Sequence, residues 1–251
     1  MRLVQVGCHT GNDPFFDYVK AKQDEIEKVV IIDALPSSVD ICEESYRANI
    51  APENLTKLTF IRAAVVANED HEDTVDFFVP RNEHSGDAEV KYTAFSSTDR
   101  DHLTRHRVTD VKKISAESSE TNQSQFTLDE VFEQQRLGEK IDRLDLDAEG
   151  LDADILLALN LERFDIPFVC FENLHVEGGV SKKDLLHQKF KDNGYRLVTL
   201  IHKANPKYGY NYDHFDWNTW ALKDMNLVAE IIEYAGHKIK FEEGFSSVVE
   251  L

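Results

Sequence analysis

The chain has 251 residues, of which 41% are hydrophobic and 30% charged, enough to bury one large α/β domain or two small ones. It carries 28 basic and 47 acidic residues, a formal net charge of −19 at pH 7. Surfaces that bind nucleic acids or anionic membranes meet phosphates with Lys and Arg, so this excess of acid argues against both partners. The sequence also has no apolar run near the roughly 18 residues that a membrane-spanning helix needs.

The three cysteines, Cys8, Cys42 and Cys170, are far apart and lack the spacing of zinc ligands. Each lies in an apolar or helical context, so we expect small buried thiols, which suit a reducing cytoplasm. The first predicted strand begins almost at residue 1, without the charged and then apolar leader of a secreted protein. These features predict a cytoplasmic location.

A glycine turn follows the first predicted strand, residues 2–7. Gly7 and Gly11 are separated by three residues in VQVGCHTGND, and glycine lets backbone approach a ligand closely. A dinucleotide fingerprint needs glycines where this chain has His9 and Asn12. The spacing therefore argues against a nicotinamide oxidoreductase and favours a nucleoside without a pyrophosphate, of which S-adenosylmethionine is the common one.

The second predicted strand, residues 28–33, ends on a carboxylate. Asp33 lies 22 residues after Gly11, and a carboxylate at this place can accept two hydrogen bonds from a ribose diol. Strand, glycine turn, strand and carboxylate together predict a nucleoside-binding unit. A plain glycine turn in an α/β core remains an equally good interpretation of these residues alone.

The rest of the chain alternates short apolar runs with helical patterns. Ser37 is placed to cap a helix, and Thr127 with Glu130 forms a capping box before another. A last helical stripe runs over residues 227–236. This alternation predicts a parallel sheet covered by helices. The further predicted strands are residues 57–66, 74–79, 141–147, 166–172, 195–202 and 218–223.

Residues 80–125 differ from their surroundings because they are polar and poor in apolar side chains. They provide no second core, so we interpret residues 1–251 as a single domain with a long polar insertion. Such insertions often carry substrate contacts or a lid. The insertion and the last helix could also support a homodimer, a question that the sequence leaves open.

A second group of polar residues lies in IDRLDLDAEG, residues 141–150. Asp145, Asp147 and Glu149 alternate, so they project to one side of an extended chain. Carboxylates at the carboxyl end of a central parallel strand lie where open α/β sheets bind ligands. The competing interpretation is that Asp147 or Glu149 only caps the helix after Gly150.

Taken together, these segments resemble the FkbM-type methyltransferases, a class I S-adenosylmethionine-dependent group. The resemblance implies a Rossmann-like, doubly wound and mostly parallel seven-stranded sheet with helices on both faces. It also implies methyl transfer to a hydroxyl, often on a sugar or secondary metabolite. The matching segments span about residues 3–175 and are VQVGCHTGN, IIDALP, TLDEVF, IDRLDLDAEG and FVCFEN.

The resemblance places the cofactor at the ends of the first three strands. Gly7 and Gly11 would border the methionine part, Asp33 the ribose, and the residues ending the third strand the adenine. The expected contacts are Gly7, His9, Gly11, Asn12, Asp33, Ala34, Ala63 and Ala64.

The chain departs from the family pattern in two places. It has Asp33 and Ala34 where the family usually has Glu-Pro, which keeps the carboxylate but shortens it by one carbon. It has Asp145 where the family tends to have Lys, two residues before Asp147. The loss of that cation predicts a more acidic site.

Methyl transfer to a hydroxyl needs an aligned acceptor and a base or metal that assists the oxygen. Asp147 is the first candidate for this base, His175 just beyond FVCFEN is the second, and Glu149 belongs to the same group. Asp147, Glu172 and Asn173 also offer the oxygen ligands that Mg²⁺ prefers. Closure of the loop by hydrogen bonds explains Glu172 and Asn173 somewhat better, so a metal is possible but not favoured.

The sequence thus predicts an S-adenosylmethionine-dependent O-methyltransferase that acts on a small hydroxylated acceptor such as a sugar or glycan. The alternative is a non-catalytic binding or scaffold module that retains the fold. The identity of the acceptor and the oligomeric state stay open.

Overall fold

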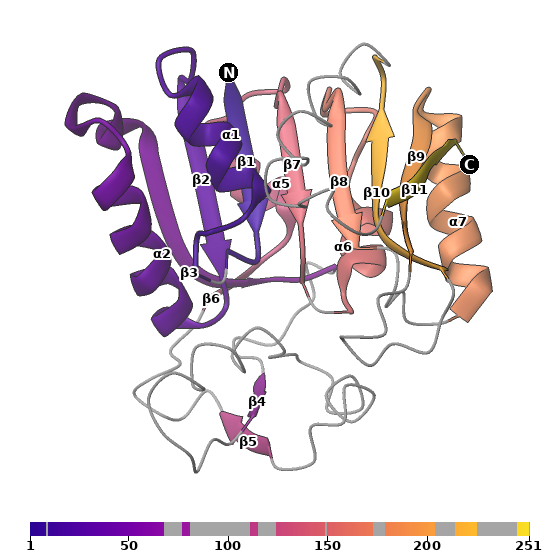
Figure 1. Ribbon diagram of the computed structural model, residues 1–251, viewed down its shortest axis with the longest axis horizontal. Helices are drawn as coiled ribbons and strands as arrows, with labels where there is room; N and C mark the ends of the chain where they lie inside the picture. The colour runs from indigo at the N-terminus through magenta and orange to yellow at the C-terminus, as the bar shows by residue number, and fades with distance from the viewer. Residues whose placement is uncertain are drawn as a thin grey trace.

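The computed structural model describes residues 1–8, 10–67, 77–80, 111–114, 124–148, 150–172, 179–203, 214–224 and 245–250. Within these ranges the chain forms a nine-stranded sheet in the order β11-β9-β10-β8-β7-β1-β2-β3-β6 (Figure 1). Its strands are β1 Arg2–Val6, β2 Lys28–Asp33, β3 Leu58–Val65, β6 Ser124–Phe126, β7 Arg143–Leu146, β8 Phe168–Glu172, β9 Arg196–Lys203, β10 His214–Leu222 and β11 Phe245–Glu250.

The sheet is mostly parallel, as the sequence predicts. Strands β6, β3, β2, β1, β7 and β8 pair in parallel. Strand β10 is antiparallel to both β8 and β9, and β11 is antiparallel to β9. The expected number of seven strands is exceeded because β6 and β11 extend the two edges.

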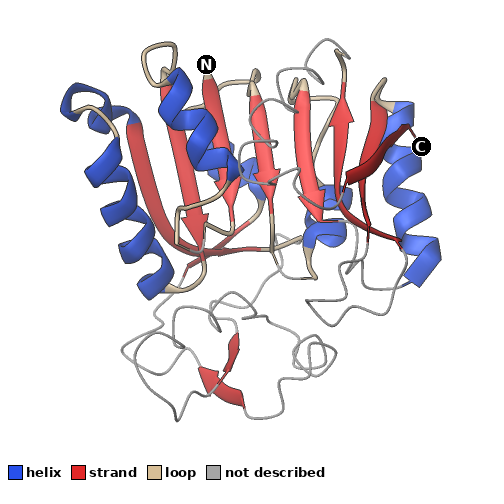
Figure 2. Cartoon of the chain, viewed as in Figure 1, coloured by secondary structure: helices blue, strands red, loops and turns tan. Residues whose placement is uncertain are grey.

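Helices cover both faces of the sheet (Figure 2). They are α1 Pro14–Lys22, α2 Pro36–Asn49, the 3-10 helix η1 Pro52–Lys57, α5 Leu128–Gln134, α6 Asp152–Ala158 and α7 Gly179–Asp192. Helices α1 and α2 pack on one face, where Phe15, Phe16 and Tyr46 meet Val29 and Ile31 of β2. Helices α5, α6 and α7 contribute to the larger core on the other face.

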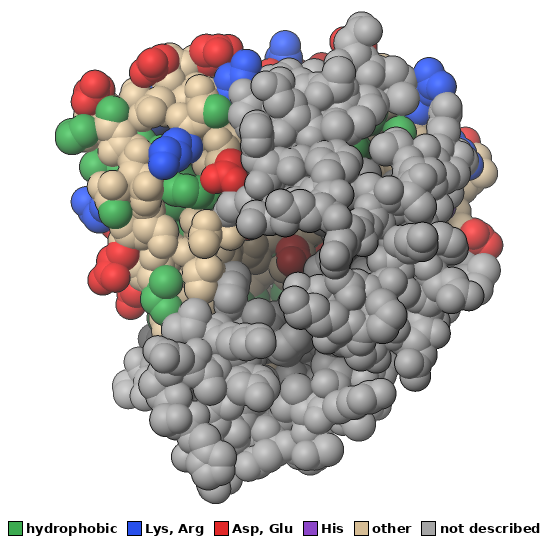
Figure 3. Space-filling view, viewed as in Figure 1, with side chains coloured by type: hydrophobic (Ala, Val, Ile, Leu, Met, Phe, Trp, Pro, Cys, Tyr) green, Lys and Arg blue, Asp and Glu red, His purple; other side chains and the backbone are tan. Residues whose placement is uncertain are grey.

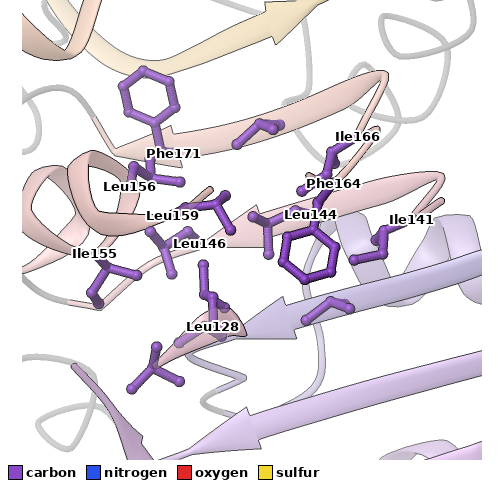
Figure 4. Packing of buried hydrophobic residues seen from close by; sticks show 14 of the residues in the cluster. Leu128, Ile141, Leu144, Leu146, Ile155, Leu156, Leu159, Phe164, Ile166 and Phe171 are labelled. Carbon is purple, nitrogen blue, oxygen red and sulfur yellow. The ribbon is translucent and has the colours of Figure 1, made fainter. Parts of the chain in front are cut away.

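Strand β2 shows why the central strands are continuous apolar runs in the sequence. Val30 and Ile32 face the larger core, whereas Val29 and Ile31 face the smaller one, and all four are fully buried. A strand covered on both faces has no polar side to display. Figure 4 shows the larger core, in which labelled side chains of β7, β8, α5 and α6 converge.

Two helix starts test the predicted caps. The capping box before α5 is confirmed, because the Thr127 hydroxyl accepts from the Glu130 N–H at 3.2 Å and Glu130 Oε2 accepts from the Thr127 N–H at 2.7 Å. The predicted cap at Ser37 is wrong. Helix α2 begins one residue earlier at Pro36, after Leu35, and no side chain caps it. The fixed φ of proline suits the first helical position without a side-chain cap.

The polar insertion is described only in part. Strand β4, Phe77–Pro80, pairs antiparallel with β5, Val111–Ile114, in a separate two-stranded sheet. At the end of the insertion, Ser124–Phe126 forms β6, which joins the main sheet beside β3. The predicted helix over residues 227–236 lies outside the described residues. Whether the chain is a single domain remains a prediction.

The strand order reverses next to β1. The chain runs outward from β1 through β2 to β3 and returns to lay down β7 and β8 on the opposite side. Ligands in open α/β sheets bind beyond the carboxyl ends of the strands at such a reversal. Here those ends are Gly7 after β1 and Asp147 after β7, the two segments that the sequence selects.

Candidate functional site

Other parts of the protein pack closely against both glycines of the turn after β1. Gly7 and Gly11 have φ angles of +79° and +61°, which side chains rarely adopt. A Cβ on Gly7 would lie 1.9 Å from the backbone oxygen of Asp147, and one on Gly11 would lie 2.8 Å from Cys42 Sγ. We expected this space to admit a ligand, but protein atoms occupy it. The side-chain positions therefore serve the fold, and any contact with a cofactor comes from the backbone of the turn.

Asp33 fastens this turn to the next helix. One of its carboxylate oxygens accepts a hydrogen bond from the Cys8 N–H at 3.0 Å, and the other accepts from the Leu35 N–H at 2.8 Å. These two bonds give Asp33 a structural role at the end of β2. Its contact with the ribose of a cofactor stays a prediction. Ala34 follows it and is half-buried.

Asp13 is a carboxylate of this edge that the sequence reasoning missed. Its Oδ1 accepts from the Phe16 N–H at 2.8 Å and caps α1, and its Oδ2 accepts from Gln5 Nε2 at 2.8 Å. An Asp directly before Pro14 at the start of a helix is a recognisable capping signal. Asn12 beside it is exposed.

Asp147 lies immediately beyond β7, next to the glycine turn. Its backbone N–H donates to Val6 O at 2.9 Å, which extends the contact between β1 and β7 past the strand ends. Solvent reaches its side chain, and no described residue forms a hydrogen bond or ion pair with its carboxylate. Figure 3 shows acidic atoms set back from the surface near the middle of the molecule.

The pKa of Asp147 lies well above its ordinary value. Its side chain is open to solvent but lies among densely packed protein, and this partial desolvation is the largest cause, followed by the negative charge of Glu172. Asp152, Asp13 and Asp33 add to this effect. Like charges disfavour ionisation, so the site raises the affinity of this carboxylate for a proton.

Asp152, which the sequence reasoning also missed, binds backbone at the ends of β7 and β8. Its carboxylate accepts from the Ala148 N–H at 2.6 Å and from the Glu172 N–H at 3.0 Å, and the residue is 3% exposed. The N-cap of α6 is Leu151, without a side-chain cap. Asp147 therefore does not cap this helix, which removes the competing interpretation for that residue.

The departure at Asp145 is compensated within the same strand. Asp145 receives two hydrogen bonds from Arg143, at 2.6 and 2.7 Å. The guanidinium lies 4.6 to 5.4 Å from the ring centroids of Phe15, Tyr18 and Phe168. The charge of Asp145 is thus paired, and the carboxylates that act on Asp147 come from other elements of the fold. That the missing cation makes the site more acidic stays a prediction.

The third-strand residues and the cysteines are largely buried. Ala63 and Ala64 are 1% and 4% exposed at the end of β3, and their proximity to adenine stays a prediction. Cys8 and Cys42 are buried free thiols, as expected, whereas Cys170 is only partly covered. A hydrogen bond with Cys42, and then burial, raises the pKa of Cys8.

Several predicted site residues lie outside the described part of the chain, namely His9, Glu149, Asn173 and His175. Among the residues that the structure describes, no three His, Cys, Asp or Glu side chains are grouped to hold a metal ion. No helix in the described ranges is long and apolar enough to cross a membrane.

The reversal of strand order and the turn beside it define a Rossmann-like α/β fold of the class I methyltransferase kind. The chain belongs to the family of the methyltransferase FkbM domain, whose family model matches residues 5–197. The suspected family is thus confirmed, and with it S-adenosylmethionine-dependent methylation as the general activity. Comparison with curated proteins finds no matching sequence.

Solved structures with a similar arrangement share little sequence with this chain. A precorrin-6y C5,15-methyltransferase from Geobacter metallireducens GS-15 is 8% identical, with a TM-score of 0.41 over 89% of this chain and 81% of that one. The methyltransferase domain of bacterial CtHen1 is 9% identical, with a TM-score of 0.41 over 88% and 89%. A spermidine synthase from Thermotoga maritima is 9% identical, with a TM-score of 0.41 over 97% and 59%.

The contact between Gly7 and Asp147 predicts that Gly7→Ala destabilises the fold. The added methyl group meets backbone, which cannot move aside as a side chain could. We expect a loss of at least about 2 kcal/mol in the free energy of unfolding, measured with urea. Gly194→Ala is the control, because Gly194 has a φ of +82° and a methyl group added there would meet no atom within 4 Å. Equal losses in the two variants would contradict the proposed steric cause.

Removing one partner of the Arg143–Asp145 pair should leave a buried charge without compensation. The side chains are 8% and 15% exposed, so we expect Asp145→Asn to lower the free energy of unfolding by about 3–5 kcal/mol. Glu133→Gln breaks the surface pair with Arg163, whose side chains are 54% and 45% exposed. That control should cost less than about 1 kcal/mol. A similar small change in both variants would show that the buried pair is not stabilising.

Proposed function

We propose that this protein transfers the methyl group of S-adenosylmethionine to a hydroxyl of a small acceptor, such as a sugar or glycan, with Asp147 as the base. The observation that carries the proposal is the state of the Asp147 carboxylate. It lies at the reversal of strand order, is reached by solvent, has a raised pKa, and is bound by no other described residue.

The residues at the end of β2 fit the cofactor. Asp33 ends β2 beside the glycine turn, where its carboxylate accepts the Cys8 N–H, and a carboxylate at such a strand end can accept hydrogen bonds from a ribose diol. The carboxylates of Asp13 and Asp33 act on Asp147 and so lie near the same edge. Their negative charge suits the positive charge of a sulfonium. When bound, S-adenosylmethionine supplies the electrophilic methyl group.

Asp147 would bind the acceptor hydroxyl and take its proton as the oxygen bonds to the methyl carbon. The leaving thioether departs neutral and needs no acid, so the proton remains on Asp147. The neighbouring carboxylates favour this outcome because neutral Asp147 relieves their repulsion. A raised pKa also brings a carboxylate closer to the value at which a general base is effective near neutral pH.

Binding of the cofactor can be tested through Asp33. We expect S-adenosylhomocysteine to bind with a free energy of roughly −7 to −8 kcal/mol by calorimetry. Asp33→Ala should weaken this by about 1–3 kcal/mol, since a charged acceptor to two hydroxyls is lost. Asp33→Glu restores the family's carboxylate and should bind more tightly than Asp33→Ala. Asp40→Ala, an exposed change on α2 that breaks a pair with Arg62, is the control, and unchanged affinity in Asp33→Ala would remove Asp33 from the ribose.

The role of Asp147 can be tested with Asp147→Asn, which keeps the shape and removes the charge. In a methyl-release assay over methyl glycosides, polyols and phenols, we expect kcat/KM to fall by about 10²–10⁴ while affinity for S-adenosylhomocysteine is unchanged. In the wild type, activity should be lost as pH falls through a pKa above the ordinary value of Asp, because the base must be ionised. Full activity of Asp147→Asn would overturn the assignment.

Further measurements distinguish a catalytic base from a metal ligand and from a non-catalytic scaffold. Ionisation of Asp147 lowers the free energy of unfolding, because the folded state disfavours the charged carboxylate. This destabilisation is complete above the raised pKa, shrinks as the pH falls toward the ordinary pKa of Asp, and is absent below that value. Asp147→Asn should therefore melt at a higher temperature than the wild type at neutral pH but not below about pH 4. Activity lost in EDTA and restored by Mg²⁺ would assign a metal role instead. Binding of S-adenosylhomocysteine without transfer to any acceptor would favour the non-catalytic scaffold.

A further inference from the structure

The registered pairing of strands β7 and β8 ends at the edge of the sheet where the site lies. Their registered pairs run from Leu144 opposite Val169 to Leu146 opposite Phe171 and end there. Beyond this point the N–H groups of Ala148 and Glu172 donate to the two oxygens of Asp152. One carboxylate thus joins the ends of two strands just where the sheet no longer does.

Asp152 is itself firmly placed. It is the first residue of α6, only 3% exposed, and the next residues of the helix, Ala153, Ile155 and Leu156, are buried in the larger core. Both oxygens accept N–H groups, and hydrogen bonds to an ionised acceptor are stronger than neutral ones. The position of the helix therefore fixes both strand ends together.

We propose that Asp152 is a positioning residue that sets the separation between Asp147 and Glu172 at the ends of β7 and β8. The proposal rests on the proposed function, in which Asp147 receives the acceptor proton. Asp147 is held by the Val6 carbonyl on one side, through its own N–H at 2.9 Å, and is followed by Ala148 on the other. Glu172 is the strongest charge acting on Asp147, so a shift of either strand end changes the surroundings of the base.

Asp152→Asn tests this role because an amide keeps one oxygen and turns an N–H group toward the other backbone donor. We expect kcat on the acceptor panel to fall by about 10–100-fold, as a misplacement near 1 Å would cause. KM for S-adenosylmethionine and the Kd of S-adenosylhomocysteine should change less than about two-fold, since Asp33 and the glycine turn keep their contacts. A merely structural role would not lower kcat while it left KM and Kd nearly unchanged.

The matched control is Asp154→Asn, in the same first turn of α6. Its side chain is 38% exposed, and its carboxylate binds Lys182 at 2.8 Å rather than the strand ends. It removes the same charge from the same helix and should leave kcat within about two-fold of the wild type. Equal loss of kcat in both variants would overturn the proposal.

Amide hydrogen exchange supplies a readout that needs no acceptor. In Asp152→Asn the amides of Ala148 and Glu172 should lose protection, while those of the central strands keep it. Persistent protection at both amides would overturn the bridge, and wild-type kcat with both amides released would overturn the positioning role. A wild type that is inactive on the whole panel overturns the proposed function and with it the positioning role. In that case exchange still shows whether the bridge exists, so the two failures are distinguished.

Discussion

The close contact between the backbones of Gly7 and Asp147 is the constraint on which the site depends. With no Cβ on Gly7, the carbonyl of Asp147 lies where a side chain would have been. The Asp147 N–H can then reach the Val6 carbonyl, so the contact between β1 and β7 continues beyond both strands. This approach brings the glycine turn and the candidate base to the same place. Any residue larger than glycine would push them apart.

The carboxylates of this edge divide into two kinds. Asp13, Asp33 and Asp152 each use both oxygens to accept N–H groups. Together they shape the start of α1, the glycine turn, the start of α2 and the ends of β7 and β8. Asp147 has no such bond to any described residue, and the charges of the others raise its pKa. The structural carboxylates therefore also create the electrostatic environment of the candidate base. Functional sites commonly keep such unfavourable groups at a cost in stability.

The ion pair of Arg143 and Asp145 shows how this chain accommodates its departure from the family pattern. Residues two apart in a strand project to the same face, so an Arg at 143 can neutralise an Asp at 145. Its cation lies among the rings of Phe15 and Tyr18 of α1 and Phe168 of β8. The positive charge is thus present in the strand and is paired with Asp145.

The sequence by itself determined the parallel core, the glycine turn, the capping box at Thr127 and the choice of Asp33 and Asp147, because apolar runs, turns and caps are local signals. Only the tertiary structure decided that Cys42 fills the space beside Gly11, that β6 and β11 extend the sheet, and that Asp152 reaches Glu172, twenty residues further along the chain. The raised pKa of Asp147 belongs to the same group. It depends on charges at the ends of β2 and β8 and at the starts of α1 and α6. These positions are distant in sequence, and only the packing of helices on the sheet brings them together.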